Sequence, residues 1–245
     1  MLMTAVIAHR GASGVAPENT LRAIALAAEQ GAVWVELDVM LTADELPIIF
    51  HDTAVIKDKT WQQLQSFQVP APVGSPELSA PIATLQEAVN LIHQLSMGLN
   101  LEIKPTTAGL GELTLQRSLE VLQTCPAIHL VISSFDFNAL QAAKALAPNI
   151  PRALLYKKLA TNWRDAVREY AVRSVHLAEA TLLQEDVAQI RALGLDVYIY
   201  TVNDLVINKR LVSWGVNGIF SDFPVLFTHL PETNSRRVSA YGEPI

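Results

Sequence analysis

Ionisable side chains stand at alternate positions of two apolar segments, where a buried strand would favour valine or leucine. Glu36 and Asp38 lie in VWVELDVML, and Glu102 and Lys104 lie in NLEIKP. Residues two apart share one face of a strand. A buried carboxylate is costly unless it is paired or binds a metal. Three carboxylates and one lysine therefore predict one divalent cation, and oxygen ligands favour Mg²⁺, Ca²⁺ or Mn²⁺ over zinc.

Two histidines end apolar runs and are candidates for proton transfer. His9 ends AVIAH, and His51 ends LPIIFH. An imidazole titrates near neutral pH and suits general acid–base catalysis. Arg10 directly follows His9, and together with Lys104 it could hold an anion. The combination predicts a phosphate-ester substrate, because a cation can polarise a phosphoryl oxygen.

The elements that would position these groups alternate between strand and helix patterns. The predicted strands are residues 5–9, 33–38, 99–103, 130–135, 152–156, 174–178, 196–202 and 218–222. The predicted helices between them are residues 20–30, 84–97, 111–124, 136–146, 161–172, 184–193 and 204–214. Eight such units in this length predict an α/β fold, a (β/α)8 TIM barrel. A doubly wound open sheet is the alternative, but the first strand leads into HRGASG and then a turn with an N-cap, unlike a dinucleotide-binding loop.

One segment breaks the alternation and predicts a short insertion after the second strand. LPIIFHD follows that strand too closely for a parallel crossover, so we expect an antiparallel hairpin. A turn at 43–45 would set Asp38 roughly opposite His51. Residues 53–83 are polar and proline-rich, with one short helical patch at 61–67, and are expected to pass over the barrel mouth. We expect one catalytic barrel over 1–231 and a polar tail over 232–245.

Composition limits the other classes of function. The 245 residues are 50% hydrophobic and 17% charged, which is typical of a globular domain with a large core. A net charge of −6 argues against binding to nucleic acid or stable association with an anionic membrane. Cys125 is the single cysteine and cannot form an internal disulfide. We expect a cytoplasmic protein with a small-molecule substrate; the sequence does not specify its oligomeric state.

Each candidate residue alone has an ordinary structural explanation. A carboxylate at a strand end is often a salt-bridge partner or a solvated rim residue, and His9 could be a core histidine. The shared phase of the charged residues on three strands favours a common site, because the C-terminal ends of barrel strands form the catalytic face.

These segments together resemble the glycerophosphodiester phosphodiesterase family, particularly its bacterial cytosolic type. The matching stretches lie between residues 7 and 224: AHRGASGVAPENTLRAI, VELDVMLTADELPIIFHD, NLEIKP, SSF, YTVND and WGVNGIFSDFP. The resemblance implies a TIM barrel with an insertion after its second strand. It also implies hydrolysis of glycerophosphodiesters to sn-glycerol 3-phosphate and an alcohol, with attack either by water or by the neighbouring glycerol hydroxyl.

The resemblance also implies residue roles. His9 and His51 would be the acid–base pair, and Glu36, Asp38 and Glu102 the metal ligands. Arg10 and Lys104 would bind the phosphate. Tyr200 stands where the family commonly has tryptophan and could line the glycerol pocket, or it could pack in the core.

The chain departs from the family pattern at several positions. Asn217 replaces a usual aspartate, for which we expect little effect because asparagine keeps most of the local hydrogen bonding. TAVIKDKTWQQL after Asp52 also differs from the common pattern, and the insertion is short, which bears on substrate range. Two rival functions are a metal-assisted isomerase or lyase acting on a sugar or sugar acid, and a non-catalytic barrel that binds phosphorylated ligands.

Overall fold

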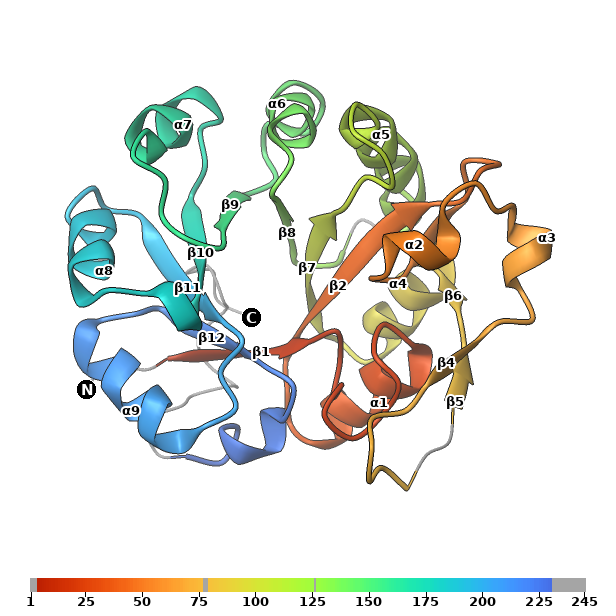
Figure 1. The fold of residues 1–245 in the computed structure, drawn as a ribbon, viewed down its shortest axis with the longest axis horizontal. Coiled ribbons are helices and arrows are strands. Elements are labelled where there is room, and N and C mark those ends of the chain that lie inside the picture. Colours follow the sequence, from red (N-terminus) through yellow and green to blue (C-terminus); the bar gives the residue numbers. More distant parts are fainter. Residues whose placement is uncertain (1–3, 77–78, 126, 231–245) are drawn as a thin grey trace.

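The computed structural model describes residues 4–76, 79–125 and 127–230, and within them eight parallel strands close into a barrel (Figure 1). The order is β1, β2, β7, β8, β9, β10, β11, β12, and β12 pairs with β1 to complete the ring. The bounds are β1 Ala5–His9, β2 Trp34–Leu41, β7 Gly98–Ile103, β8 Leu130–Ser134, β9 Arg152–Tyr156, β10 Ser174–Ala178, β11 Asp196–Tyr200 and β12 Gly218–Ser221. The predicted (β/α)8 barrel is confirmed, and the alternative open sheet is wrong because each of the eight strands is hydrogen-bonded to two neighbours, which leaves the ring without a free edge.

Helices surround the barrel, as Figure 1 shows for α5 to α9. Their bounds are α1 Leu21–Glu29, α4 Leu85–Gln94, α5 Gly111–Leu122, α6 Phe137–Leu146, α7 Trp163–Glu169, α8 Gln184–Arg191 and α9 Leu205–Trp214, with short 3₁₀ turns at Glu179–Thr181 and Pro224–Leu226. Thr20, Thr84, Asp136 and Asp204 cap four of them, and each side chain accepts a hydrogen bond from a backbone N–H of the first turn. All seven predicted helices are present, each between one and five residues shorter than its sequence pattern.

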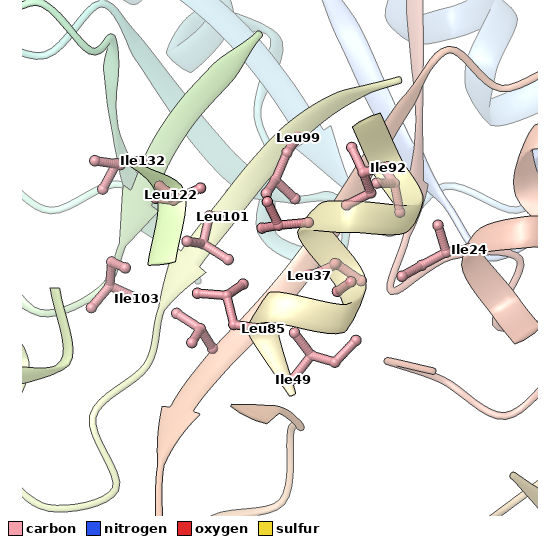
Figure 2. Close-up of a cluster of buried hydrophobic side chains, with 14 of the residues drawn as sticks. Ile24, Leu37, Ile49, Leu85, Ile92, Leu99, Leu101, Ile103, Leu122 and Ile132 are labelled. Atoms are coloured by element: carbon pink, nitrogen blue, oxygen red, sulfur yellow. The ribbon is translucent and has the colours of Figure 1, made fainter. Parts of the chain in front are cut away.

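Alternation along the strands separates the core from the site. Leu37 and Leu101 belong to a buried cluster between the strands and the outer helices, with Ile24 and Ile92 contributed from α1 and α4 (Figure 2). Their sequence neighbours on β2 and β7 therefore face the barrel interior. The same strands that supply leucine to the core thus supply carboxylates to the inside.

The hairpin after β2 is present and shifted by one residue from the expectation. β3 (Pro47–Ile49) pairs antiparallel with β2, with Val39 opposite Ile49. The turn is centred on Asp44, so the backbone carbonyl of Asp38 accepts from the N–H of Phe50 at 3.0 Å. The expectation that Asp38 lies roughly opposite His51 is met to within one position, because a turn centred on residue 44 sets Asp38 opposite Phe50, the neighbour of His51.

The insertion forms a small layer of its own, more ordered than its polar sequence indicated. It contains α2 (Thr53–Ile56), α3 (Trp61–Leu64), β4 (Gln68–Pro70), β5 (Ser79–Pro81) and β6 (Ala83–Thr84). β4 pairs with β5, and β6 joins the main sheet through β3. A buried cluster of Met40, Ile48, Phe50, Ile56, Leu64, Val69 and Ile82 attaches the insertion to the hairpin. The predicted tail 232–245 lies outside the described residues.

The helices of the described ranges were also compared with the length and hydropathy that a bilayer requires. None of them is both long and apolar enough to cross a membrane.

The apolar core between the strands and the outer helices is expected to supply much of the free energy of unfolding. Leu101→Ala is expected to lower the free energy of unfolding by about 2–5 kcal/mol, because the side chain is fully buried and its removal leaves a cavity. Leu146→Ala is the matched control on the surface of α6, where 51% of the residue is exposed, and is expected to change stability by less than about 0.5 kcal/mol. Urea denaturation of both variants measures the difference; equal losses would contradict this placement of the core.

Candidate active site

The strand register brings the sequence-predicted carboxylates together at the C-terminal end of the barrel. His9 on β1 lies beside Glu36 on β2. Two residues further along β2, Asp38 lies beside Glu102 on β7. Glu36 and Asp38 share the inward face, so one carboxylate from β7 and two from β2 converge. One oxygen from each lies within 4.8 Å of the others.

This acid cluster fits a hard cation. Burial raises the pKa of Glu36 well above its ordinary value, and repulsion from Asp38 and Glu102 raises it further. Burial and the charge of Asp38 likewise raise the pKa of Glu102 to about 8. Because the pKa values of these two carboxyl groups are raised, a cation bound beside them would favour their ionised forms. The three oxygen donors suit Mg²⁺, Ca²⁺ or Mn²⁺.

Asp38 differs from the other two acids because cations already surround it. Arg10 Nε lies 3.1 Å from its Oδ2, and Lys104 Nζ lies 3.6 Å from its Oδ1. Asn19 donates its side-chain amide to Oδ2 at 2.8 Å and accepts from the Asp38 backbone N–H at 3.1 Å. Burial opposes ionisation of Asp38, but Arg10, Lys104 and His51 outweigh it and lower its pKa. Asp38 is thus held as a carboxylate.

The loop after β1 is shaped to deliver Arg10 to this cluster. Arg10 adopts a left-handed backbone conformation (φ 55°), which directs its N–H to Glu36 Oε2 at 2.9 Å. Gly11 follows at φ 83°, and a Cβ there would lie 2.6 Å from the backbone of Ala23. Only glycine permits this close approach to α1. The guanidinium also donates to Glu18 at 2.9 Å.

His9 is held by Asp222, a residue to which the sequence analysis gave no role. The His9 Nδ1 and Asp222 Oδ1 atoms are 2.7 Å apart. Ser13 donates to the same Asp222 oxygen at 2.9 Å, and Asn203 donates to Oδ2 at 2.7 Å. Burial opposes ionisation of Asp222, but the hydrogen bonds and charge of His9 outweigh it and hold the pKa at about 2. A permanent carboxylate on Nδ1 leaves Nε2 free to exchange a proton.

His51 lies at the same cavity as His9, so the structure brings both imidazoles to the acid cluster. A cavity of about 760 Å³ is lined by both histidines, Glu36, Glu102 and Arg10. His51 is half-buried, and this burial lowers its pKa, while Asp38 opposes the change. A histidine with a lowered pKa is neutral at pH 7 and can accept a proton.

The far wall of this cavity is aromatic and contains Tyr200. Its hydroxyl donates to the Tyr156 carbonyl at 3.0 Å, and its ring meets Phe135 edge-to-face at 6.3 Å between centroids. Burial raises the pKa of Tyr200 above its ordinary value, so the hydroxyl stays neutral. His176 and Phe220 close the base of the cavity. Tyr200 therefore lines the cavity, while its fixed hydroxyl also anchors it to β9.

Three residues bear on what the sequence analysis missed or left open. Asp222 directly follows β12, so the rule that selected carboxylates at strand ends would also have selected it. Glu18, which pairs with Arg10, carries no comparable signal because it lies in a loop. Asn217 accepts from the Val197 backbone N–H at 2.8 Å and donates to Asp196 at 2.7 Å. Its two hydrogen bonds tie β11 to the start of β12, at the end opposite the site.

The chain is similar in sequence and in fold to known proteins. The model of the glycerophosphoryl diester phosphodiesterase family matches residues 9–226. A Bacillus subtilis (strain 168) relative is 32% identical over 89% of this chain and 94% of its own length. The glycerophosphodiester phosphodiesterase of Caldanaerobacter subterraneus subsp. tengcongensis is 30% identical over 94% of this chain and 98% of its own. A solved Oleispira antarctica phosphodiesterase, in complex with the product sn-glycerol-3-phosphate, has a TM-score of 0.84 and 35% identity, and the alignment covers 91% of this chain and 95% of that one.

The acid cluster predicts an unusual pH dependence of stability in the metal-free protein. Glu102 has a higher pKa folded, about 8, than unfolded, about 4.5, so the folded state binds its proton more tightly. Stability is therefore lost as pH rises through this window. In EDTA at pH 8, Glu102→Gln is expected to be more stable than the parent by about 2–4 kcal/mol.

Denaturant titrations at pH 5 and pH 8 measure this effect. Glu185→Gln on the exposed start of α8 is the control and is expected to match the parent at both pH values. Addition of Mg²⁺, Ca²⁺ or Mn²⁺ should raise the thermal midpoint of the parent and leave that of Glu102→Gln nearly unchanged. If the stability of the parent and of Glu102→Gln depended on pH in the same way, the pKa of Glu102 would not be raised in the folded protein.

Proposed function

The chain belongs to the glycerophosphoryl diester phosphodiesterase family and hydrolyses glycerophosphodiesters to sn-glycerol 3-phosphate and an alcohol, and we propose that it does so by acid–base catalysis with His9 and His51 beside one divalent cation. The observation that supports this mechanism is the placement of both imidazoles around a single buried acid cluster in one cavity. Glu36, Asp38 and Glu102 are the proposed ligands of the cation, which would be Mg²⁺, Ca²⁺ or Mn²⁺.

The proposed reaction needs two proton transfers on opposite sides of the phosphorus atom. One histidine takes the proton of the attacking hydroxyl as the new P–O bond forms. The other gives a proton to the alcohol oxygen as the old P–O bond breaks. Asp222 suits His9 to either step, because it stabilises the imidazolium that forms when Nε2 holds a proton. His51, with its lowered pKa, suits removal of the proton from the nucleophile.

Arg10 and Lys104 are the proposed phosphate ligands. Both cations lie at the acid cluster, and both line the catalytic cavity. A guanidinium and an ammonium stabilise the additional negative charge that the phosphoryl oxygens gain in the transition state. When bound, the cation supplies Lewis-acid polarisation of a phosphoryl oxygen.

Tyr200 is the proposed contact for the glycerol part of the substrate. Its ring forms an apolar wall of the cavity, and its anchored hydroxyl fixes that wall in place. The nucleophile is either water or the adjacent glycerol hydroxyl, which would give a cyclic phosphate first. Both routes need the same two imidazoles, so the residue roles do not depend on the choice.

The rival functions are less well supported by this arrangement. A barrel that only binds ligands has no need for an imidazole held on a carboxylate at 2.7 Å beside a second imidazole. A sugar isomerase or lyase would not need a guanidinium and an ammonium placed for a tetrahedral anion. Identification of glycerol 3-phosphate as the product separates the phosphodiesterase from both rivals.

Metal removal and histidine substitution test the proposed mechanism. Dialysis against EDTA is expected to abolish release of glycerol 3-phosphate from glycerophosphocholine, and one of the three cations should restore it. His9→Ala and His51→Ala are each expected to lower kcat by about 10²–10⁴-fold. His93→Ala, on the exposed side of α4, is the control and should retain full activity. Full turnover by His51→Ala, or activity undiminished in EDTA, would contradict the mechanism.

Asp222 is expected to act through His9. In Asp222→Asn the carboxylate that stabilises the imidazolium is lost, so kcat should fall by about 10- to 1,000-fold while KM changes little. Asp165→Asn, at an exposed position of α7, is the control for loss of one carboxylate. Steady-state kinetics with the thermal midpoint of each variant decide between positioning and folding. A fall in activity that tracks a fall in thermal stability would show that Asp222 serves only the fold.

A further inference from the structure

A second cavity, of about 350 Å³, lies between the insertion and the loop that follows β1. Phe50, Phe67, Val69 and Pro70 form apolar walls, and Glu18 and Asp52 add two carboxylates. The walls belong to the small core that joins the insertion to the hairpin, which fixes Phe50 and Val69 in place. None of the proposed acid–base, metal-binding or phosphate-binding residues lines this cavity.

The second cavity adjoins the catalytic one, because residues that line it contact or directly follow residues that line the catalytic cavity. Glu18 lines it and accepts from the Arg10 guanidinium at 2.9 Å. Asp52, which also lines it, directly follows His51 in the chain. Ser13 lines it as well and donates to the His9 carbonyl at 2.7 Å. A phosphate held by Arg10 therefore has a cavity on each side.

Charge is divided between the two cavities. The catalytic cavity contains Arg10, Lys104 and Lys157, which together with a bound cation suit an anion. Among the described residues, those lining the second cavity include two carboxylates and neither lysine nor arginine. One of these acids, Glu18, is already paired with Arg10, so Asp52 carries most of the uncompensated charge. The second cavity thus suits a cation.

The aromatic walls suit the same kind of ligand. Phe50 and Phe67 meet edge-to-face, with 5.8 Å between centroids and 88° between planes. Apolar and aromatic surface next to a carboxylate favours an alkylated ammonium group, which is poorly hydrated and is attracted to ring faces. Asp52 is fixed in this position because its Oδ1 accepts from the Ala54 backbone N–H at 2.9 Å, which caps α2.

We propose that this second cavity binds the alcohol part of the substrate and selects glycerophosphodiesters whose alcohol carries a quaternary ammonium group. The inference rests on the proposed function, because it assumes that the phosphate lies at Arg10 between the two cavities. The glycerol part then occupies the catalytic cavity beside Tyr200, and the ammonium group lies between Asp52 and the ring of Phe67.

Competing substrates of similar size test this assignment. The quantity measured is the ratio of kcat/KM for glycerophosphocholine to that for glycerophosphoglycerol, whose alcohol is neutral. Asp52→Asn keeps an oxygen that can cap α2 and removes the charge, so the ratio should fall about two- to fivefold. Phe67→Leu keeps the apolar wall and removes the ring, and a similar fall is expected. Any effect of Asp52 on His51 changes kcat/KM for both substrates equally and therefore cancels in this ratio.

Asp58→Asn is the matched control, since it removes one carboxylate from the same insertion at a position outside the cavity lining. Asparagine also tolerates the left-handed backbone of residue 58 (φ 62°). Its ratio should equal that of the parent. Tetramethylammonium is the second probe: it should inhibit the parent competitively and inhibit Asp52→Asn less.

The outcomes separate this inference from the proposed function. Hydrolysis of neither diester would overturn the function and this inference with it. Hydrolysis of both, with a ratio that Asp52→Asn and Phe67→Leu leave unchanged, would overturn the subsite alone. A preference of the parent for glycerophosphoglycerol would do the same. A lowered ratio in both variants, unchanged in Asp58→Asn, supports the assignment.

Discussion

Repulsion among three buried carboxylates is the constraint on which the site depends. Glu36, Asp38 and Glu102 converge because β2 and β7 pair in a register that sets Asp38 beside Glu102. Arg10 and Lys104 compensate the charge of Asp38, and the other two acids are left with raised pKa values. The barrel thus retains a destabilising group of charges at its mouth. Such a group is stable as three carboxylates only when another positive charge joins it.

The loop between β1 and α1 places hydrogen-bond donors and a cation beside these carboxylates. Arg10 is placed by a left-handed residue followed by Gly11, which packs against α1 with no room for a Cβ. Asn19, also left-handed, uses both ends of its amide on Asp38. These two unusual conformations lie in one loop and serve adjacent acids. The left-handed backbone conformations of Arg10 and Asn19 bring the Arg10 guanidinium and the Asn19 amide to Asp38. The strands alone would leave this carboxylate unpaired.

Much of the barrel could be predicted from sequence because each strand pattern is local. Alternation along β2 and β7 identified the inward acids, and the structure places the intervening Leu37 and Leu101 in the core. The register of the hairpin was one residue off, since alternation does not fix which residues face each other across a turn. Asp222 was missed as the partner of His9, because a contact between residues 213 apart in the chain depends on closure of the barrel. The insertion was read as polar, yet its few apolar side chains meet those of the hairpin only in three dimensions.

The division of charge between the two cavities follows from which segments build them. Strand ends supply the three carboxylates of the catalytic site, so the positions of these acids are fixed by barrel register. The insertion supplies Phe67 and Val69 to the second cavity through its own small core. Substitutions there leave the barrel strands untouched. Chemistry and choice of alcohol are therefore encoded in separate parts of the chain, which meet at the pair formed by Arg10 and Glu18.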